Sequence, residues 1–295
     1  MAPWAEIQSA IAGATGAPFE IESRTAIGGG SINRCFRVAG QAHTFFIKLN
    51  SGERRAMFEA EAAGLAEIAA TGTIRVPSPV CHGANQETAW LVIEHIDFGD
   101  ASTRSMAQLG AQLAALHRTT HSRYGWSADN TIGATPQINT RCRDWVEFWR
   151  ERRLKSQLAL AAGNGAPQSL LEKGERLARD FAVLLNGVTV TPALLHGDLW
   201  GGNAGFDRAG APVIFDPAVY YGHREADLAM TELFGGFSAD FYAAYRDSYA
   251  LDSGYDVRKQ LYNLYHVLNH FNLFGGDYAR QAEIMTARLL AELNG

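Results

Sequence analysis

The spacing of apolar positions changes along this chain, from strand-like runs in the first third to helix-like repeats afterwards. Short runs rich in β-branched and aromatic residues, separated by glycine-rich or polar turns, predict strands at residues 21–27, 35–38, 44–49 and 89–93. One helix interrupts them over residues 55–70, where Phe58 and Leu65 share an apolar face and Gly72 follows the end. The pattern therefore predicts a small antiparallel sheet with one inserted helix.

Apolar residues repeat at helical intervals through most of the remaining sequence. The predicted helices cover residues 103–117, 144–160, 168–185, 225–234, 239–250, 257–274 and 278–293. Two brief apolar strands, at 193–195 and 213–215, break the series, and each ends at a polar cluster, so the clusters are expected to meet at neighbouring strand ends. The whole pattern predicts an α+β fold with two lobes, a β-rich lobe over residues 1–97 and a mostly α-helical lobe over residues 98–295.

The composition indicates which binding partners and which cellular compartment to expect for this protein. The 295 residues carry a formal charge of -5, which argues against a surface that binds the phosphate backbone of a nucleic acid. The N-terminus lacks a basic start followed by an apolar run, and no apolar stretch approaches the roughly 18 residues that a membrane-spanning helix needs. Cys35, Cys81 and Cys142 are widely separated and predict free thiols. We therefore expect a soluble, cytoplasmic protein that binds neither nucleic acid nor membrane.

The two polar clusters have the residue types and spacing of a phosphoryl-transfer loop. Residues 196–203 read His-Gly-Asp-Leu-Trp-Gly-Gly-Asn, and Asp216 follows the next strand. Asp198 would accept a hydrogen bond from an attacking hydroxyl, whereas Asn203 and Asp216 would offer oxygen ligands to Mg²⁺ on the phosphates of ATP. We expect His196 to hold the loop rather than to act as a base. In the alternative interpretation these residues only form turns, because Asp, Asn and Gly are common turn residues.

The first lobe offers groups that could hold the phosphates of a nucleotide. Gly28, Gly29, Gly30 and Ser31 lie between two predicted strands, where exposed backbone N–H groups could cover phosphates, although a structural turn would have the same composition. Lys48 stands within an apolar strand, and a buried ammonium needs a carboxylate or phosphate partner. The alternative is an edge lysine whose stem packs on the strand while its ammonium reaches solvent.

The predicted helix after this strand provides a carboxylate for Lys48. Glu61 falls beside the apolar face of the helix and Glu59 points further towards solvent, so Glu61 is the preferred partner. In kinases such an ion pair holds the lysine against the α- and β-phosphates. Glu94 and Ile96 follow the last strand of the first lobe and are expected to present backbone groups to the adenine edge. The first lobe would thus bind the nucleotide, and the helical lobe would supply catalysis and bind the acceptor.

These motifs resemble the fructosamine-3-kinase, or ketosamine-3-kinase, family, whose fold is protein-kinase-like and aminoglycoside-phosphotransferase-like. The matching segments are LLHGDLW at 194–200 with Asn203, DPAVYYG at 216–222, READLAMTELFGGF at 224–237, GGGSIN at 28–33, Lys48, and MFEAE at 57–61. The resemblance covers most of the chain and implies ATP- and Mg²⁺-dependent phosphorylation of the 3-hydroxyl of ketosamines, the sugar adducts that glycation leaves on amines. The phosphorylated adduct decomposes, so the implied activity is a deglycation repair. The family pattern also implies that Asp227 supports the catalytic loop.

The sequence says less about the residues that bind the acceptor than about those that bind the nucleotide. Trp200 and Tyr220 adjoin the acidic groups, and aromatic faces suit sugars and amine-linked adducts, but these residues could equally belong to the core. Ser31 stands where some relatives carry a redox-active cysteine, and His223 stands where an acidic residue is common. The sequence leaves open the preferred sugar, a free or a protein-linked amine, and the oligomeric state.

Two alternatives to a ketosamine kinase follow from the same residues. Another small-molecule kinase of this fold, of the aminoglycoside or choline type, would use the same phosphate machinery with a different acceptor pocket. A non-catalytic, nucleotide-binding pseudokinase would keep the fold without turnover. A protein kinase is disfavoured because the segment between Asp216 and Glu225 is too short for an activation segment that docks a peptide.

Overall fold

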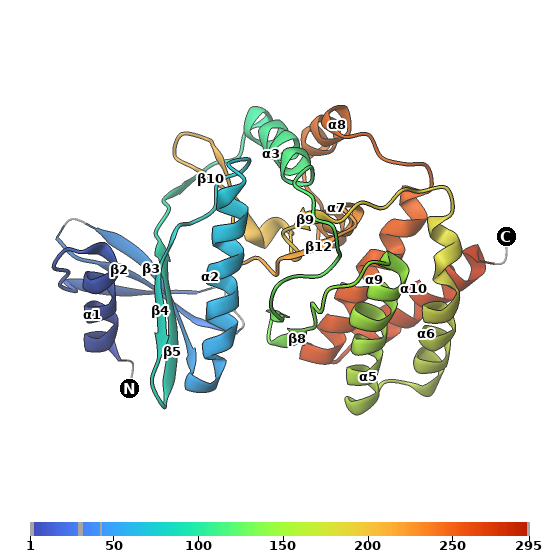
Figure 1. The fold of residues 1–295 in the computed structure, drawn as a ribbon, viewed down its shortest axis with the longest axis horizontal. Helices are drawn as coiled ribbons and strands as arrows, with labels where there is room; N and C mark the ends of the chain where they lie inside the picture. Colours follow the sequence, from blue (N-terminus) through green and yellow to red (C-terminus); the bar gives the residue numbers. More distant parts are fainter. Residues whose placement is uncertain (1–2, 29–31, 42, 294–295) are drawn as a thin grey trace.

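The protein folds into two lobes that lie next to each other along its longest axis (Figure 1). The computed structural model describes residues 3–28, 32–41 and 43–293. A five-stranded antiparallel sheet with a helix on each face forms the N-terminal lobe, coloured blue to cyan, and a mostly helical lobe follows from green to red. This is the arrangement that the change of hydrophobic pattern predicts.

The N-terminal sheet has the strand order β1-β2-β3-β5-β4, and every neighbouring pair is antiparallel. Its strands are β1 (Ser23–Ile27), β2 (Arg34–Ala39), β3 (Thr44–Ser51), β4 (Pro79–Ala84) and β5 (Thr88–Glu94). Because side chains alternate along a strand, β3 sends Ile47 and Leu49 to one face and Lys48 to the other. Lys48 therefore lies on the face that is turned towards the helical lobe.

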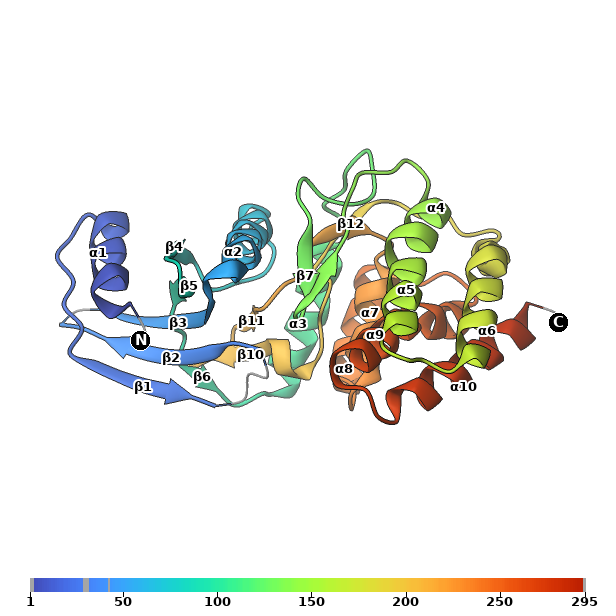
Figure 2. The ribbon, with the colours of Figure 1, turned by 90° about the horizontal axis from the view of Figure 1, so that it is seen from below.

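Helices cover both faces of this sheet. α1 (Trp4–Thr15) packs on one face, where Ile7 and Ile11 join the apolar side chains of β3 and β5. α2 (Arg55–Ala70) follows a short 3-10 segment (Gly52–Arg54) and lies on the other face, between the sheet and the helical lobe (Figures 1 and 2). The sequence pattern predicts α2 but not α1, because the apolar repeat of α1 is short, with only Trp4, Ile7 and Ile11 as large members.

The helical lobe is built around one long central helix, α9. Its helices are α3 (Thr103–Leu116), α4 (Trp145–Trp149), α5 (Lys155–Gly163), α6 (Gln168–Asp180), α7 (Glu225–Leu233), α8 (Ala239–Ser248), α9 (Tyr255–Phe274) and α10 (Tyr278–Glu292). α9 packs against α5, α7 and α10. The continuous helix predicted over 144–160 is instead interrupted by a π-helical segment (Arg150–Leu154), and a 3-10 segment (Phe181–Leu185) follows α6.

Small sheets lie between the two lobes (Figure 2). β6 (Phe98–Gly99), β10 (Ala204–Asp207) and β11 (Pro212–Ile214) form one, β9 (Ala193–Leu195) pairs with β12 (Tyr220–Gly222), and β7 (Asn130–Ile132) pairs with β8 (Thr135–Gln137). β9 and β11 thus lie in different sheets, although the sequence suggests neighbouring strands. Their polar ends still meet, because Ala218 N–H donates to His196 O over 2.8 Å and Phe215 N–H donates to Asn203 O over 3.0 Å.

The described part of the chain contains no helix that is both long enough and apolar enough to cross a membrane. Cys35, Cys81 and Cys142 are half-buried free thiols, as their spacing predicts. Burial raises the pKa of Cys81 to about 11, so this thiol stays protonated near neutral pH.

Candidate active site

A cavity of about 460 Å³ opens between the sheet of the first lobe and the small sheets of the second. The residues that line it include Gly28, Asn33, Cys35, Phe46, Lys48 and Glu61 from the first lobe and Asn130, Asp198, Trp200, Asn203, Phe215 and Asp216 from the second. Its volume is typical of a small-molecule site, which spans roughly 300–1,000 Å³. The fold therefore collects the predicted chemical groups of both lobes around one space.

Lys48 binds two carboxylates inside this cavity. Its Nζ lies 2.6 Å from Oε1 of Glu61 on α2 and 2.6 Å from Oδ1 of Asp216 after β11, and the lysine side chain is 3% exposed. Burial alone would lower the pKa of Lys48, but the negative charges of Asp216 and Glu61 outweigh burial and raise it above its usual value. The lysine therefore stays charged, and one ammonium joins the two lobes.

Glu61, and not Glu59, is the carboxylate that meets Lys48. Glu59 forms an exposed ion pair of 2.6 Å with Arg55, one turn earlier on α2. Residues two positions apart on a helix point about 200° apart, so only one of these two glutamates can face the sheet.

Asp198 and Asn203 face the cavity from the loop that follows β9. Nδ2 of Asn203 donates to the backbone oxygen of Asp198 over 2.8 Å and to its carboxylate Oδ2 over 3.3 Å. Burial, reinforced by the negative charge of Asp216, raises the pKa of Asp198 to about 7. A general base works best when its pKa is near the working pH, so Asp198 is suited to take a proton from a hydroxyl.

Main-chain contacts fix the loop of Asp198 against the loop of Asp216. Gly197 has a φ of +85°, and a Cβ at this position would lie 2.0 Å from the backbone oxygen of Ala218, so only glycine permits the approach. Asp216 has a φ of +58°, which within the described ranges is the one positive φ at a non-glycine position. Such strained backbone is typical of functional sites.

The buried carboxylate of Asp227, on α7, holds the backbone of the catalytic loop. It accepts hydrogen bonds from the N–H groups of His196 (2.7 Å) and Gly197 (2.8 Å) and contacts Nε2 of His117 at 3.2 Å. Burial acts to raise the pKa of Asp227, but the interactions with His117 and the backbone outweigh burial and lower it. His196 is fully buried, and its Nε2 donates to Phe215 O over 2.9 Å. Both residues thus shape the loop, as expected.

Asn203 and Asp216 could hold a metal ion. The amide nitrogen of Asn203 is committed to Asp198, which leaves its Oδ1 available, and Asp216 is 44% exposed with only Oδ1 engaged by Lys48. Two hard oxygen ligands leave most coordination positions to water and phosphate, which is the arrangement that Mg²⁺ prefers. An all-protein cage is not offered here, since no three His, Cys, Asp or Glu side chains cluster for a metal in the described part of the chain.

The predicted glycine-rich turn is placed only in part. Gly28 lines the cavity at the end of β1, whereas Gly29, Gly30 and Ser31 lie outside the described residues. Asn33, just after the turn, also lines the cavity and accepts a hydrogen bond from Nδ2 of Asn50 over 2.8 Å. That bond ties the end of the turn to β3.

The predicted adenine-binding segment lies at the edge of the sheet. The Glu94 side chain pairs with Arg75 over 2.6 Å, and the Glu94 N–H donates to Ser78 O over 2.8 Å. The backbone of Ile96 makes no hydrogen bond to any residue that the structure describes. Neither residue is among those that line the cavity within the described ranges.

The two aromatic residues predicted at the acceptor side differ in position. Trp200 lines the cavity, is 38% exposed and packs against Phe234 with ring centroids 6.2 Å apart. Tyr220 is 3% exposed and packs on Phe148 and on Arg153, whose guanidinium lies 4.1 Å from its ring centroid. The Tyr220 ring thus packs in the core of the helical lobe and is not among the described residues that line the cavity, and its contact with the acceptor stays a prediction.

Two features of the site carry no signal in the sequence. The β7–β8 hairpin contributes Asn130 and Gly133 to the cavity wall, and strands of three residues are too short to show a period. Glu67 of α2 accepts hydrogen bonds from Tyr221 Oη over 2.8 Å and from Trp126 Nε1. These three residues stand far apart in the chain, so only the fold shows that they anchor α2.

Comparison with known proteins identifies the family of this chain. The family profile described as fructosamine kinase matches residues 3–292. The chain belongs to the fructosamine kinase family. Its relatives include a protein named as the probable ketoamine kinase slr1563 of Synechocystis sp., which is 48% identical over 98% of this chain and 97% of the relative. A protein-ribulosamine 3-kinase of Arabidopsis thaliana, named as chloroplastic, is 45% identical over 87% of this chain and 79% of the relative.

Solved structures confirm the fold class. A protein named as a candidate fructosamine-3-kinase, from Haemophilus somnus 129PT, is 28% identical and superposes with a TM-score of 0.89 over 97% of each chain. A thermostable mutant of the aminoglycoside phosphotransferase APH(4)-Ia is 13% identical, with a TM-score of 0.62 over 98% of this chain and 99% of its own. The second likeness concerns the fold alone. Both support the predicted two-lobed, kinase-like α+β fold of this fructosamine kinase family member.

Proposed function

We propose that this protein transfers the γ-phosphoryl group of ATP to the 3-hydroxyl of ketosamines. The observation that carries the reaction type is the meeting of Lys48, Glu61 and Asp216 at 2.6 Å in a cavity that Asp198 also lines. Relatives named ketoamine kinase and protein-ribulosamine 3-kinase support the acceptor class. Phosphorylation at this hydroxyl would lead the adduct to decompose and free the amine, so the activity is a deglycation repair.

Asp198 acts on the acceptor. It accepts a hydrogen bond from the 3-hydroxyl, orients that oxygen towards the γ-phosphorus and takes the proton as the new P–O bond forms and the bond to ADP breaks. Lys48, oriented by Glu61, binds the α- and β-phosphates. Holding both reactants in line supplies much of the catalysis in phosphoryl transfer, because the transferring group needs little covalent chemistry from the protein.

Asn203 and Asp216 would hold Mg²⁺ in this proposal. When bound, the ion would supply positive charge that offsets the negative charge of the phosphates. The oxygen donors of both side chains fit it, and the remaining coordination positions are open to phosphate and water.

The remaining contacts of the proposal come from the edges of the cavity. The backbone N–H of Gly28 covers the phosphates, and Glu94 and Ile96, which lie outside the cavity lining, present backbone groups to adenine. Trp200 contacts the acceptor, supported by its exposed ring beside Asp198. Residues 1–97 then form the nucleotide lobe and residues 98–295 form the catalytic and acceptor lobe.

The proposal includes a cytoplasmic, reducing compartment. Cys35, Cys81 and Cys142 would stay unpaired there, in keeping with their free thiols. The partner is a small-molecule or protein-linked ketosamine, and the net charge of -5 supports this over a nucleic acid.

A panel of acceptors tests the reaction. ADP release is measured with fructosyl-amines, ribulosyl-amines, choline and kanamycin at fixed MgATP. We expect turnover with one or both classes of ketosamine and none with choline or kanamycin. Turnover of kanamycin or choline without any ketosamine activity would refute the proposed acceptor.

Replacing the proposed base tests the mechanism. Asp198→Asn should lower kcat by about 10²- to 10⁴-fold while ATP still raises the melting temperature, because the carboxylate acts on the hydroxyl and not on the nucleotide. Asp247→Asn, at an exposed position of α8, is the matched control and should keep the wild-type kcat. An unchanged kcat in Asp198→Asn would show that another group orients the acceptor.

A further inference from the structure

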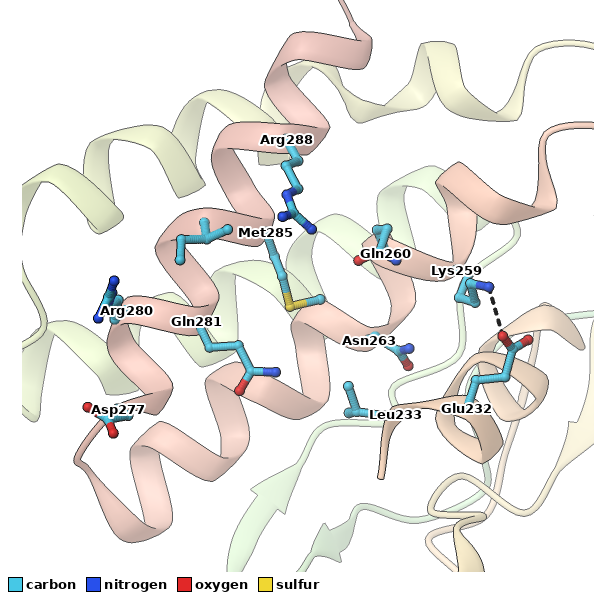
Figure 3. A pocket seen from close by; sticks show the side chains of 11 residues that line it. Glu232, Leu233, Lys259, Gln260, Asn263, Asp277, Arg280, Gln281, Met285 and Arg288 are labelled. Carbon is cyan, nitrogen blue, oxygen red and sulfur yellow. Dashed lines mark hydrogen bonds and ion pairs between the residues drawn. The ribbon is translucent and has the colours of Figure 1, made fainter. Parts of the chain in front are cut away.

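A second cavity, of about 590 Å³, lies on the helical lobe away from the nucleotide cavity (Figure 3). α9 forms one wall, α10 forms the opposite wall, and the end of α7 closes one side. We call it the α9–α10 groove. Its described lining includes Leu233, Asn263, Arg280, Gln281, Met285 and Arg288, and none of these residues takes part in the proposed phosphoryl transfer.

Asn263 is an unpartnered polar side chain at the floor of the groove. It is 4% exposed, its Oδ1 is fully buried, and its amide makes no hydrogen bond to any residue that the structure describes. Leaving a buried amide unpaired costs about 1–3 kcal/mol, unless a bound group supplies the missing partner. Gln281 projects into the groove from the facing helix (Figure 3) and also lacks a side-chain partner within the described chain.

The groove also holds two arginines without counter-charges. Arg280 and Arg288 are exposed on α10, eight residues and so about 12 Å apart, and neither forms an ion pair with a described carboxylate. Lys259, at the far wall, is neutralised by Glu232 over 2.7 Å. Asp277 is the one other carboxylate in the described lining, so three cations stand against two carboxylates, on a chain whose net charge is -5.

An aromatic path leads from the groove to the proposed base. Leu233 of the groove precedes Phe234, whose ring lies 6.2 Å from Trp200 and 4.8 Å from His270. The His270 ring lies 5.2 Å from Tyr278, the first residue of α10. Trp200 lines the nucleotide cavity together with Asp198, so side-chain contacts through Phe234 connect the groove with that cavity.

We propose that the α9–α10 groove binds the polypeptide that carries the ketosamine, with acidic side chains of that peptide on Arg280 and Arg288. This inference rests on the proposed function. Asn263 can donate from its amide nitrogen to a carbonyl of the peptide backbone, whereas its Oδ1 stays buried. The ring contacts Trp200–Phe234, Phe234–His270 and His270–Tyr278 lead from the cavity to the start of α10, so the proposal puts the acidic residues about three to six positions from the modified lysine, at ~3.3 Å per extended residue. The enzyme therefore acts on acidic protein segments in preference to free adducts.

Matched substrates test this proposal. Two peptides carry the same ribulosyl-lysine or fructosyl-lysine, one with glutamates three to six positions away and one with glutamines there, and a ketosamine of a simple alkylamine is the third substrate. We expect the acidic peptide to have the lowest KM, with a preference that weakens as salt rises. In Arg280→Glu/Arg288→Glu its KM should rise about 3- to 10-fold, since two exposed charge pairs are lost, while the KM of the alkylamine adduct stays unchanged.

Two further variants separate docking from folding. Arg143→Glu/Arg246→Glu makes the same change of net charge at exposed positions outside the groove and should leave all three KM values as in the wild type. Asn263→Asp keeps the size of the side chain but replaces its amide donor by a negative charge. It should raise the KM of both peptides and leave that of the alkylamine adduct unchanged.

The three substrates also distinguish the possible failures. Equal KM values of the wild type for the acidic and the neutral peptide, or an equal change of all three KM values in Arg280→Glu/Arg288→Glu, overturn the groove as a peptide site. Turnover of the alkylamine adduct in that case leaves the ketosamine kinase assignment standing. An enzyme that phosphorylates none of the three substrates would instead refute the proposed function itself.

Discussion

Lys48 is the side chain on which the two lobes converge. A buried ammonium is stable only beside opposite charge, and Glu61 and Asp216 each approach it to 2.6 Å from different lobes. If one carboxylate is removed, the other keeps Lys48 charged, but the ammonium is no longer held in one position. Glu61 would then act through Lys48, as a positioning residue for the phosphates.

Glu61→Gln tests that role at constant side-chain size. We expect kcat/KM for ATP to fall about 10- to 100-fold, because a charge-assisted hydrogen bond contributes about 1.5–3 kcal/mol. Steady-state kinetics at varied ATP measures it. Glu59→Gln, whose only described partner is the exposed Arg55, is the matched control and should stay within about twofold of the wild type. Equal losses in the two variants would contradict the assignment of Glu61.

Residues with a strong chemical requirement were the easiest to place from the sequence. The spacing of Asp198, Asn203 and Asp216 and the single charge of Lys48 in an apolar strand each demand a specific environment, and the fold brings all four to one cavity. Tyr220 has no such requirement. An aromatic ring suits a sugar site and a core equally, so its burial could not be read from its neighbours in the chain.

Among the elements, α2 matters most for the site, and it is fixed to the helical lobe. Tyr221 Oη donates to Glu67 over 2.8 Å, and Trp126 binds the same carboxylate. Gly64 allows the close approach, since a Cβ there would lie 3.0 Å from Cγ2 of Val219. Because α2 also carries Glu61, the placement of the buried ion pair depends on these contacts.

Tyr221→Phe removes one hydrogen bond from the α2 anchor. We expect the free energy of unfolding to fall by about 1–3 kcal/mol, because the Glu67 oxygen loses its partner, and kcat/KM for ATP to fall about 3- to 10-fold. Urea unfolding and kinetics at varied ATP measure the two effects. The KM for the ketosamine should not change, and an equal rise there would mean that the loss spreads through the whole fold.

Tyr249→Phe is the control for the α2 anchor. The Tyr249 hydroxyl makes no hydrogen bond to a described residue, and its ring packs against Arg224 and Arg118. The variant should retain the wild-type unfolding free energy to within about 0.5 kcal/mol and the wild-type kinetics.

Long periodic elements were predictable, and elements made by tertiary contacts were not. α2 and α9 carry several turns of apolar repeat, and both occur where the pattern predicts them. α1 has only Ile7 and Ile11 on its buried face, and β12 exists only because it pairs with β9. The π-helical segment at Arg150–Leu154 keeps a helical repeat of side chains, so the sequence does not reveal its changed hydrogen bonding.

At the scale of the whole molecule, the helical lobe keeps several histidines neutral. Burial is the largest cause of a lowered pKa for His196, His223, His266 and His270. Burial lowers the pKa of His266 to about 3, with a further lowering by nearby His270 and Arg153 that Asp227 opposes. The unfolded chain takes up these protons below pH ~6.5 and the folded chain does not, so acid lowers the free energy of unfolding.

His266→Leu measures one part of this acid sensitivity. Between pH 7.5 and 5.5 the wild type should lose about 1.4 kcal/mol more unfolding free energy than the variant, because His266 titrates only in the unfolded chain over this range. Urea unfolding of both proteins at both pH values measures this difference. The loss of packing in the variant is the same at both pH values, so it cancels when the two pH effects are subtracted. Val183→Ala, at an exposed position without a titratable group, should keep the wild-type pH dependence. An equal pH dependence of wild type and His266→Leu would contradict the neutral state of His266.

The close contact between the backbones of Gly197 and Ala218 separates two parts of the site, the catalytic loops and the walls around them. The backbone contact between Gly197 and Ala218, held in place by Asp227, sets the distance between the loops of Asp198 and Asp216. The walls that are proposed to touch an acceptor take no part in this contact. Trp200 and the ends of α7 and α10, the proposed acceptor walls, lie outside this unit. Engineering of the enzyme for new glycated amines should therefore vary the residues of those walls and keep Gly197 and Asp227 unchanged.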